Sequence, residues 1–215
     1  MYQAFPSIPG SIQPYDGAVM TCGSAVESVG PNDSSGQTTA LGLGGDAKMD
    51  ALAGAATFDA VKLTITFTTD ASVDGVSFNL LFGSEEFPEY VGAFNDAFAC
   101  FLDGENITFD ADGNAVTVNN NYFVVSDCQT MYNLPGFSGQ GYTGLTQGTA
   151  CGSPNGSTTE AGATGWLTTT APVTPGETIK LKFSIWDEGD GIYDSVVFID
   201  NFQWHGAPQT DPDTG

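Results

Sequence analysis

The sequence between residues 60 and 69 reads Ala60-Val61-Lys62-Leu63-Thr64-Ile65-Thr66-Phe67-Thr68-Thr69. Apolar and polar residues alternate at every second position, so one side of an extended chain is apolar and the other is polar. A period of two is typical of a half-buried β-strand, whereas a helix repeats its apolar residues every three or four positions. The stretch therefore predicts a β-sheet with one face against a core.

Short apolar runs of the same kind occur along the rest of the chain. The sequence predicts further strands at residues 77–82, 96–102, 107–109, 115–118, 177–186 and 194–204. Only residues 46–56 hold helix-forming residues in quantity, and Asp46 is placed to cap such a helix. Many short strands with almost no helix are typical of a β-sandwich. We expect an all-β, single-domain, jelly-roll-like sandwich with at most one or two short helices.

The segment Asp110-Ala111-Asp112-Gly113-Asn114 resembles the first half of an EF-hand loop. The twelfth position of such a loop would be Asn121 instead of glutamate, and strand patterns flank the segment instead of helical ones. Aspartate, asparagine and glycine are also the residues that tight turns require. We interpret the segment as a hairpin turn.

The length of 215 residues fits one large β domain, which we place at residues 1–206, followed by a polar tail or linker at 207–215. Residues 129–165 form a long, polar, glycine-rich loop, and such loops in compact domains are usually functional or disordered. The loop contains Tyr132, Phe137 and Tyr142. These aromatic side chains could stack on a sugar, grip a peptide side chain or hold the loop to the sandwich.

The formal net charge is −22, from 26 acidic and 4 basic residues. This charge excludes nucleic acid and anionic lipid as partners and makes multivalent cations the natural ones. Acidity alone would also fit a surface adapted to high salt. No run of eighteen apolar residues occurs, so we expect no membrane insertion, and the first residues lack the pattern of a signal peptide. We expect a mature or excised monomeric module of a larger protein.

The four cysteines are Cys22, Cys100, Cys128 and Cys151, and the absence of a CxxC pair argues against a zinc or redox site. Cys128 and Cys151 flank the glycine-rich loop, where a disulfide would reduce chain entropy. One or two disulfides, with three pairings possible, would indicate an oxidising, extracytoplasmic location. Buried free thiols are the alternative, which suits Cys100 best.

Two acidic stretches are candidates for a metal site. The first, Trp186-Asp187-Glu188-Gly189-Asp190-Gly191-Ile192-Tyr193-Asp194-Ser195, holds four carboxylates within eight positions. The second is Ser84-Glu85-Glu86-Phe87-Pro88-Glu89-Tyr90, with Asn95-Asp96 shortly after it. Crowded carboxylates repel one another unless a cation lies among them, and Ca²⁺ prefers such oxygen ligands. The single histidine, His205, lies near the tail, so a transition-metal site is not indicated.

Three blocks of the sequence, residues 82–91, 94–98 and 192–199, resemble the signature of the choice-of-anchor L domain family. Gly30-Pro31-Asn32, Gly45-Asp46 and Pro175-Gly176-Glu177-Thr178 fit the same pattern, so the resemblance covers residues 15–204. The family's members are domains of bacterial surface and secreted proteins. Similar calcium-dependent modules of repeats-in-toxin adhesins recognise peptides through a free C-terminal carboxylate. This chain departs from the family where Trp186-Asp187 replaces a common Ala-Asp, and its segment 129–158 is longer than we expect.

The resemblance implies an extracellular, calcium-dependent ligand-binding module of a bacterial surface adhesin. We expect it to recognise a peptide or protein terminus on a host or neighbouring cell through a partly open Ca²⁺ site. A calcium-dependent carbohydrate-binding module is the alternative. The expected metal ligands are Glu86, Asn95, Asp96, Asp187, Asp190 and Asp194, with Asn32 and Asp46 as further candidates, and Tyr132, Phe137 and Tyr142 are candidates for ligand contact.

An enzymatic activity is not expected. Paired carboxylates such as Glu86 and Asp194 could serve a glycoside hydrolase. Only the abundance of acidic residues points to that reaction, and the chain has no GxSxG motif, no HExxH motif and no cysteine–histidine pair.

Overall fold

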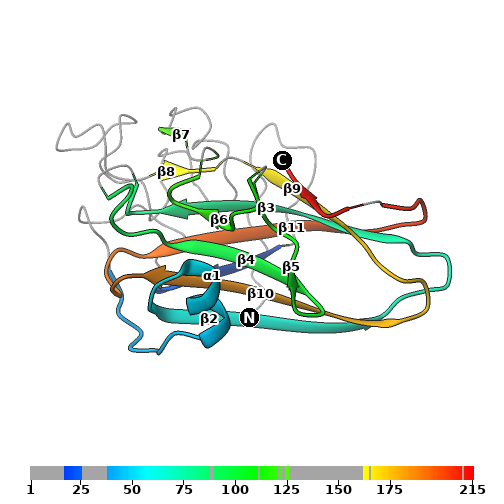
Figure 1. The fold of residues 1–215 in the computed structure, drawn as a ribbon, viewed down its shortest axis with the longest axis horizontal. Coiled ribbons are helices and arrows are strands. Elements are labelled where there is room, and N and C mark those ends of the chain that lie inside the picture. The colour runs from blue at the N-terminus through cyan, green and yellow to red at the C-terminus, as the bar shows by residue number, and fades with distance from the viewer. Residues whose placement is uncertain are drawn as a thin grey trace.

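Two antiparallel β-sheets pack against each other in the structure, a computed structural model (Figure 1). It describes residues 17–25, 38–87, 90–110, 112–120, 122, 124–125, 162–164, 166–209 and 211–215. The predicted all-β sandwich is confirmed. Among the described residues, no helix is long and apolar enough to cross a membrane.

The first sheet has seven strands and runs in the order β1-β11-β3-β8-β7, with β9 paired to another part of β3 and β12 paired to β9. Their bounds are β1 (Ala18–Thr21), β3 (Gly75–Ser84), β7 (Val124–Val125), β8 (Gly162–Ala163), β9 (Leu167–Pro172), β11 (Ser195–His205) and β12 (Asp213–Thr214). β3 and β11 form its long central pair, with Ser84 opposite Ser195 at one end and Gly75 opposite His205 at the other.

The second sheet has five strands in the order β2-β10-β4-β5, with β6 paired to β4. Their bounds are β2 (Thr57–Thr68), β4 (Ala97–Leu102), β5 (Glu105–Asn106), β6 (Val116–Thr117) and β10 (Thr178–Glu188). The alternation that predicted β2 orients Val61, Ile65 and Phe67 towards the core. Its polar partners face outwards, as expected for a strand covered on one side.

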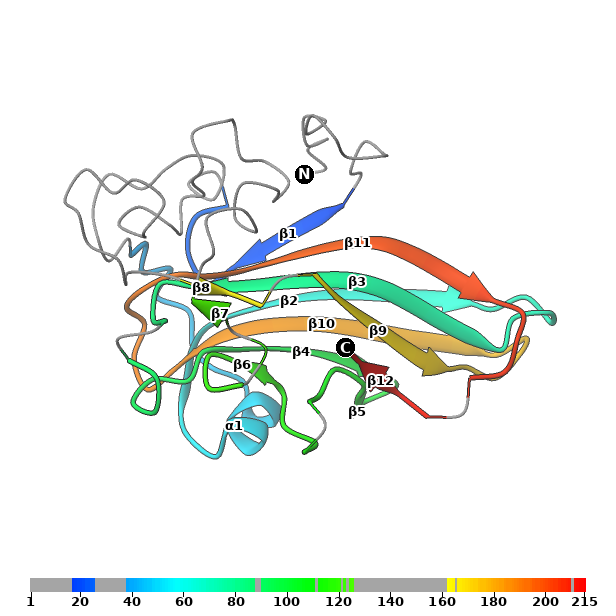
Figure 2. The same cartoon turned by 90° about the horizontal axis from the view of Figure 1, so that it is seen from above.

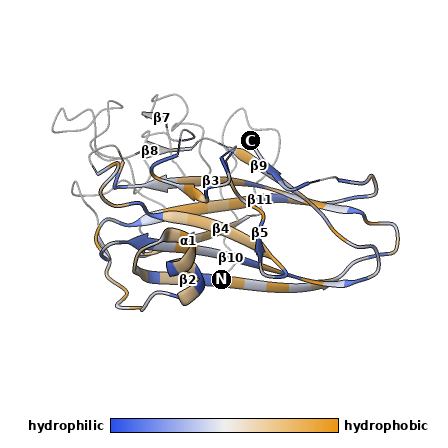
Figure 3. Ribbon diagram, in the orientation of Figure 1, coloured by the Kyte–Doolittle hydropathy of each residue, from blue (hydrophilic) through white to orange (hydrophobic). Residues whose placement is uncertain are grey.

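The core lies between the two sheets and is rich in phenylalanine. The rings of Phe78 and Phe183, one from each sheet, meet edge to face with centroids 5.2 Å apart. Such contacts add to the free energy gained from burying both rings. Figure 3 shows hydrophobic residues along β4 and β11, one strand from each sheet.

A single helix among the described residues, α1 (Ala47–Ala53), covers part of the outer face of the five-stranded sheet. Figure 2 shows it on the side of the molecule away from β11. Asp46 caps it, since its side chain accepts a hydrogen bond from the Lys48 amide, and Gly54 ends it with a φ of 75°. Met49 packs from the helix against Trp186 in a small second core.

One strand prediction was wrong, and several strands of the structure, β9 among them, were not predicted. Residues 107–109 form no strand, because the Cys100 amide donates its hydrogen bond to the Thr108 hydroxyl, at 2.7 Å, instead of to a backbone carbonyl. Phe109 alone forms an isolated β-bridge, to Ala115. β9 was not predicted, although Leu167, Thr169 and Ala171 are buried at alternate positions. The predicted hairpin turn is confirmed by two backbone hydrogen bonds, from the Asp110 amide to the Asn114 carbonyl and from the Gly113 amide to the Asp110 carbonyl.

Cys22 and Cys100 are buried free thiols. The buried-thiol alternative therefore holds for these two residues. Cys128 and Cys151 lie outside the described residues, and the prediction of a disulfide between them stays a prediction.

Candidate functional site

The two acidic stretches meet at one end of the sandwich. The β3–β4 and β10–β11 connections both leave the sheets at this end (Figure 1). The register fixes this arrangement, because Ser84 lies opposite Ser195 in one sheet and Ala97 lies opposite Trp186 in the other. We call six carboxylates gathered here the acidic end: Asp59, Glu86, Asp96, Asp187, Asp190 and Asp194.

Asp96 joins the two connections and is almost fully buried. Its Oδ2 accepts a hydrogen bond from the Ser195 hydroxyl at 2.7 Å, and its Oδ1 accepts one from the Glu188 amide at 3.0 Å. Burial raises the pKa of Asp96 to about 7, although both hydrogen bonds act to lower it, and the charges of Asp190 and Glu188 raise it further. The carboxyl group is therefore held in a fixed position, but its charge is poorly solvated.

Asp187 ends the inner face of β10 and is 3% exposed. The Cys22 thiol beside its carboxylate acts to lower the pKa of Asp187, while Asp187 Oδ1 is buried without a hydrogen-bond partner among the described residues. Burial raises the pKa of Asp187 to about 9, and the charges of Asp96, Asp194 and Asp59 raise it further. An ionised Asp187 would be unstable here without a compensating cation.

Glu86 begins the β3–β4 connection and is 1% exposed. Its amide donates to the Ser84 hydroxyl at 3.0 Å, which holds the backbone, but its Oε2 is buried without a hydrogen-bond partner in the described part of the chain. Burial raises the pKa of Glu86 to about 8, and the charges of Asp96 and Asp190 add to the rise. Glu86 and Asp187 thus share the same unsatisfied state.

Asp194 and Asp190 are oriented by backbone amides. Asp194 Oδ1 accepts a hydrogen bond from the Thr39 amide at 2.9 Å, and a Cβ atom at Gly23 would collide with the Asp194 carboxylate. Asp190 Oδ1 accepts from the Ile192 amide at 3.0 Å, which closes a turn.

Asp59 belongs to the acidic end but was not predicted from the sequence. It lies in β2 with a φ of 41°, where the register of β2 with β10 shifts, and it is buried. Its two oxygens accept the amides of Leu41 and Leu43 at 3.0 and 2.6 Å. The only sequence signal was an isolated acid between Phe58 and Ala60 at the start of a strand.

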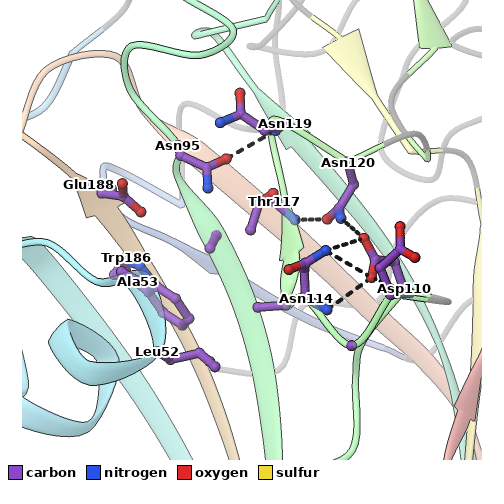
Figure 4. A pocket seen from close by; sticks show the side chains of 14 residues that line it. Leu52, Ala53, Asn95, Asp110, Asn114, Thr117, Asn119, Asn120, Trp186 and Glu188 are labelled. Carbon is purple, nitrogen blue, oxygen red and sulfur yellow. Dashed lines mark hydrogen bonds between the residues drawn. The ribbon is translucent and has the colours of Figure 1, made fainter.

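Two other predicted metal ligands lie away from this cluster. Asn95 Oδ1 accepts the Asn119 amide at 3.0 Å, and Asn95 lines a separate pocket (Figure 4). Asp46 caps α1 and forms an ion pair with Lys62 at 2.8 Å. The hydrogen bond from Lys62 lowers the pKa of Asp46 to about 2. Asn32, Tyr132, Phe137 and Tyr142 lie outside the described residues.

The chain's four lysines do not approach the acidic end. Lys62 pairs with Asp46, Lys48 and Lys182 each lie 4.8 Å from the centroid of the Phe101 ring, and Lys180 lies near the start of β10. Within the described ranges, no three aspartate, glutamate, histidine or cysteine side chains converge closely enough to hold a metal ion between them. The oxygen donors therefore suit a hard cation, but the side chains are not arranged around a common point.

The family model described as the choice-of-anchor L domain matches residues 3–203 of the chain. The searches of curated proteins and of solved structures found no match to the chain. The matched range contains every carboxylate of the acidic end and all of the long strands except the last two residues of β11.

Proposed function

Because the chain belongs to the choice-of-anchor L domain family, we propose that it is an extracellular module that binds Ca²⁺ at the acidic end and there recognises a peptide or protein terminus. The family is a domain of surface-anchored bacterial proteins and is not a known enzyme family. It implies a cell-surface or extracellular protein. Calcium binding and adhesion are our additions to this description.

The observation that carries the proposal is the pair of buried carboxylate oxygens, Asp187 Oδ1 and Glu86 Oε2, that have no hydrogen-bond partner among the described residues. An ionised carboxylate in such a place costs several kcal/mol unless a cation or hydrogen bonds compensate it. The group then either takes up a proton or binds a cation. Raised pKa values for Asp187 and Glu86 are the consequence in the absence of a cation.

Calcium fits these donors better than other common metals do. Ca²⁺ takes six to eight oxygen ligands in a flexible geometry, whereas Zn²⁺ and other transition metals favour nitrogen or sulfur. His205 makes its hydrogen bond to Ser77, at the opposite end of β11 from Ser195. Glu86 and Asp187 would supply the unsatisfied oxygens, and Asp96 would supply one held in place by Ser195 and Glu188.

Binding requires the side chains to move, because no three of the described metal-binding side chains converge in the structure. Carboxylates that repel one another without an ion would be drawn together by it. A site assembled in this way leaves coordination positions for water or for a partner.

A partner's carboxylate is the ligand that we propose for those positions. The net charge of −22 would repel an acidic peptide terminus from the bare protein. A bound Ca²⁺ makes the local electrostatic potential favourable for an anion. The partner's terminal carboxylate then fills the coordination positions of the ion that the protein's carboxylates leave open. Recognition would then depend on calcium.

The test is capture of peptides with a free C-terminal carboxylate, compared with the same peptides amidated at that end, in millimolar calcium and in chelator. We expect capture of the free-carboxylate peptides in calcium only. Capture that persists in chelator, or that is equal for amidated peptides, would contradict the proposal. A glycan array under both conditions covers the alternative, since glycan binding in calcium without peptide binding would make the module a calcium-dependent lectin.

A further inference from the structure

A polar pocket lies on the outer face of the five-stranded sheet, between the end of α1 and residues 110–120 (Figure 4). Its volume is about 420 Å³, which is within the range of small-molecule sites. The register explains the hollow, because Ala97 of β4 lies between Trp186 of β10 and Thr117 of β6. A small residue between two larger ones leaves space above it.

One wall of the pocket carries an unused donor and an unused acceptor. Trp186 and Glu188 project from the same face of β10 and line the pocket. The Trp186 side chain is fully buried, yet its Nε1 has no hydrogen-bond partner in the described part of the chain. Glu188 Oε2 is buried in the same unsatisfied state. Buried polar atoms without partners are rare in folded proteins, so this pair favours a ligand nearby. Neither atom is open to solvent in the structure, so a ligand would reach them only after a shift of the side chains that line the pocket.

The facing wall is built from asparagines. Asn95 and Asn119 use their side-chain oxygens, which accept the amides of Asn119 and Gly92 at 3.0 and 2.7 Å. No hydrogen bond between described residues uses their side-chain NH₂ groups, which are donors.

The same wall is stiffened by a hydrogen-bond network around Asp110. Asn114 Nδ2 donates to both Asp110 oxygens, at 3.2 and 3.1 Å, and Asn120 donates to the same carboxylate. Figure 4 shows this network across the pocket from Trp186. A wall held in this way is preorganised for binding.

The charge and the hydrogen-bonding groups of the pocket limit which chemical class of ligand it can bind. Three carboxylates line the pocket, from Asp110, Asp112 and Glu188, and no lysine does, so an anion would be repelled. A cation would leave the N–H groups of Trp186 and of the asparagines without an acceptor. A hydroxyl group can accept from an N–H and donate to a carboxylate. Leu52 and Ala53 add an apolar edge for the C–H surface of a ring.

We propose that this pocket is a binding site for a neutral polyhydroxylated ligand of monosaccharide size, which adjoins the acidic end but is lined by none of its six carboxylates. The site needs no calcium, because its donors and acceptors contact the hydroxyl groups directly. It is therefore independent of the function proposed above, and either can fail without the other.

The test uses ¹⁵N-labelled full chain and observes the indole N–H signals of its three tryptophans. Trp166→Phe and Trp204→Phe assign the Trp186 signal by elimination. The probes are glucose, galactose, mannose and N-acetylglucosamine, each titrated to millimolar concentrations in calcium and in chelator. We expect at least one probe to shift the Trp186 signal under both conditions and to leave the Trp204 signal in place.

Two variants of α1 form a matched pair. Ala53→Leu fills the pocket, whereas Ala51→Leu adds the same side chain to an exposed position of the helix that does not line it. Sugar binding should be lost in A53L and kept in A51L. If A53L does not fold, Glu188→Gln retains the shape but removes the charge and one of the two acceptor oxygens, and it should weaken binding about tenfold.

Four results would overturn the inference. The first is that no sugar shifts the Trp186 signal. The second is that the shift requires calcium. The third is that A53L binds the sugar as well as A51L does. The fourth is that methylammonium shifts the Trp186 signal while no sugar does, which would make the pocket a cation site.

Discussion

Asp187 follows Leu181, Phe183 and Ile185 on the inner face of β10, so the last side chain of an apolar row is a carboxyl group. The Cys22 thiol is a weak donor and compensates little of the lost hydration. Without a cation, the protonated form of this carboxyl group has the lower free energy. With Ca²⁺ bound, the ionised form has the lower free energy.

The pH dependence of stability in chelator follows from this. Folding raises the pKa of Asp187 from its ordinary value of 3.8 to about 9 and the pKa of Glu86 from its ordinary value of 4.5 to about 8. Between those limits the folded protein binds more protons than the unfolded chain, so the free energy of unfolding falls as pH rises. Asp46, whose pKa is lowered to about 2, acts in the opposite sense but only at more acidic pH.

Urea denaturation in chelator at a series of pH values from about 5 to 9 measures this slope. Asp187→Asn is the control and should reduce the slope, because its amide does not titrate, while Glu86 and Asp96 still do. A wild-type stability that is constant or rises over this range would mean that the acidic end is not desolvated as the structure has it.

Gly23 allows the Asp194 carboxylate to lie against the backbone. Gly23→Ala places a Cβ atom where that carboxylate lies, so we expect a loss of about 1–3 kcal/mol in the free energy of unfolding. Gly44→Ala is the matched control, since a Cβ there meets nothing within 4 Å. It should be neutral or slightly stabilising. Equal effects of the two substitutions in chemical denaturation would contradict the close approach.

At the scale of elements, the sequence predicts best where a pattern is local. β2 and β10 alternate along one chain segment, and both were predicted within a few residues. The strand expected at 107–109 did not form because the Thr108 side chain replaces a backbone partner of Cys100. That competition depends on a contact between segments and leaves no periodic signal.

In the candidate site, too, the sequence predicts the residues that are close together along the chain and misses those that tertiary contacts bring in. Asp187, Asp190 and Asp194 are close in sequence, so their crowding is visible without a structure. Asp59 could not be found, because the backbone amides of Leu41 and Leu43 hold it from outside its own strand. Contacts of this kind are set by tertiary structure alone.

Asp46 offers a prediction about α1. Asp46→Ala removes the helix cap and the ion pair with Lys62, so it should lower the free energy of unfolding by about 1 kcal/mol. Calcium affinity should not change, because the Asp46 side chain is already bonded to the Lys48 amide and to Lys62.

Asp112→Ala removes an exposed carboxylate from the hairpin turn and should change the free energy of unfolding by less than about 0.5 kcal/mol. Calorimetric calcium titration of both variants checks this, and a large loss of affinity in D46A would restore Asp46 as a metal ligand.

At the scale of the whole molecule, the charges are distributed unequally. All four lysines lie on α1 or on strands of the five-stranded sheet, in β2 and β10, while the acidic end has none. Monovalent salt screens exposed charges over about 10 Å at 0.1 M, so it should relieve the surface repulsion of the −22 charge. It should not replace an ion bound among buried carboxylates. The effect of calcium on stability can therefore be distinguished from the effect of monovalent salt at the same ionic strength.

Thermal unfolding of the wild type and of Asp187→Asn, in millimolar calcium and in chelator with sodium chloride at matched ionic strength, tests the calcium site most directly. A ligand that binds only the folded state stabilises it by about 3 to 4 kcal/mol at hundreds of times its Kd. We predict a melting temperature that rises sharply with calcium in the wild type and little in D187N. A wild-type transition at the same temperature in calcium and in chelator would contradict a calcium site at the acidic end.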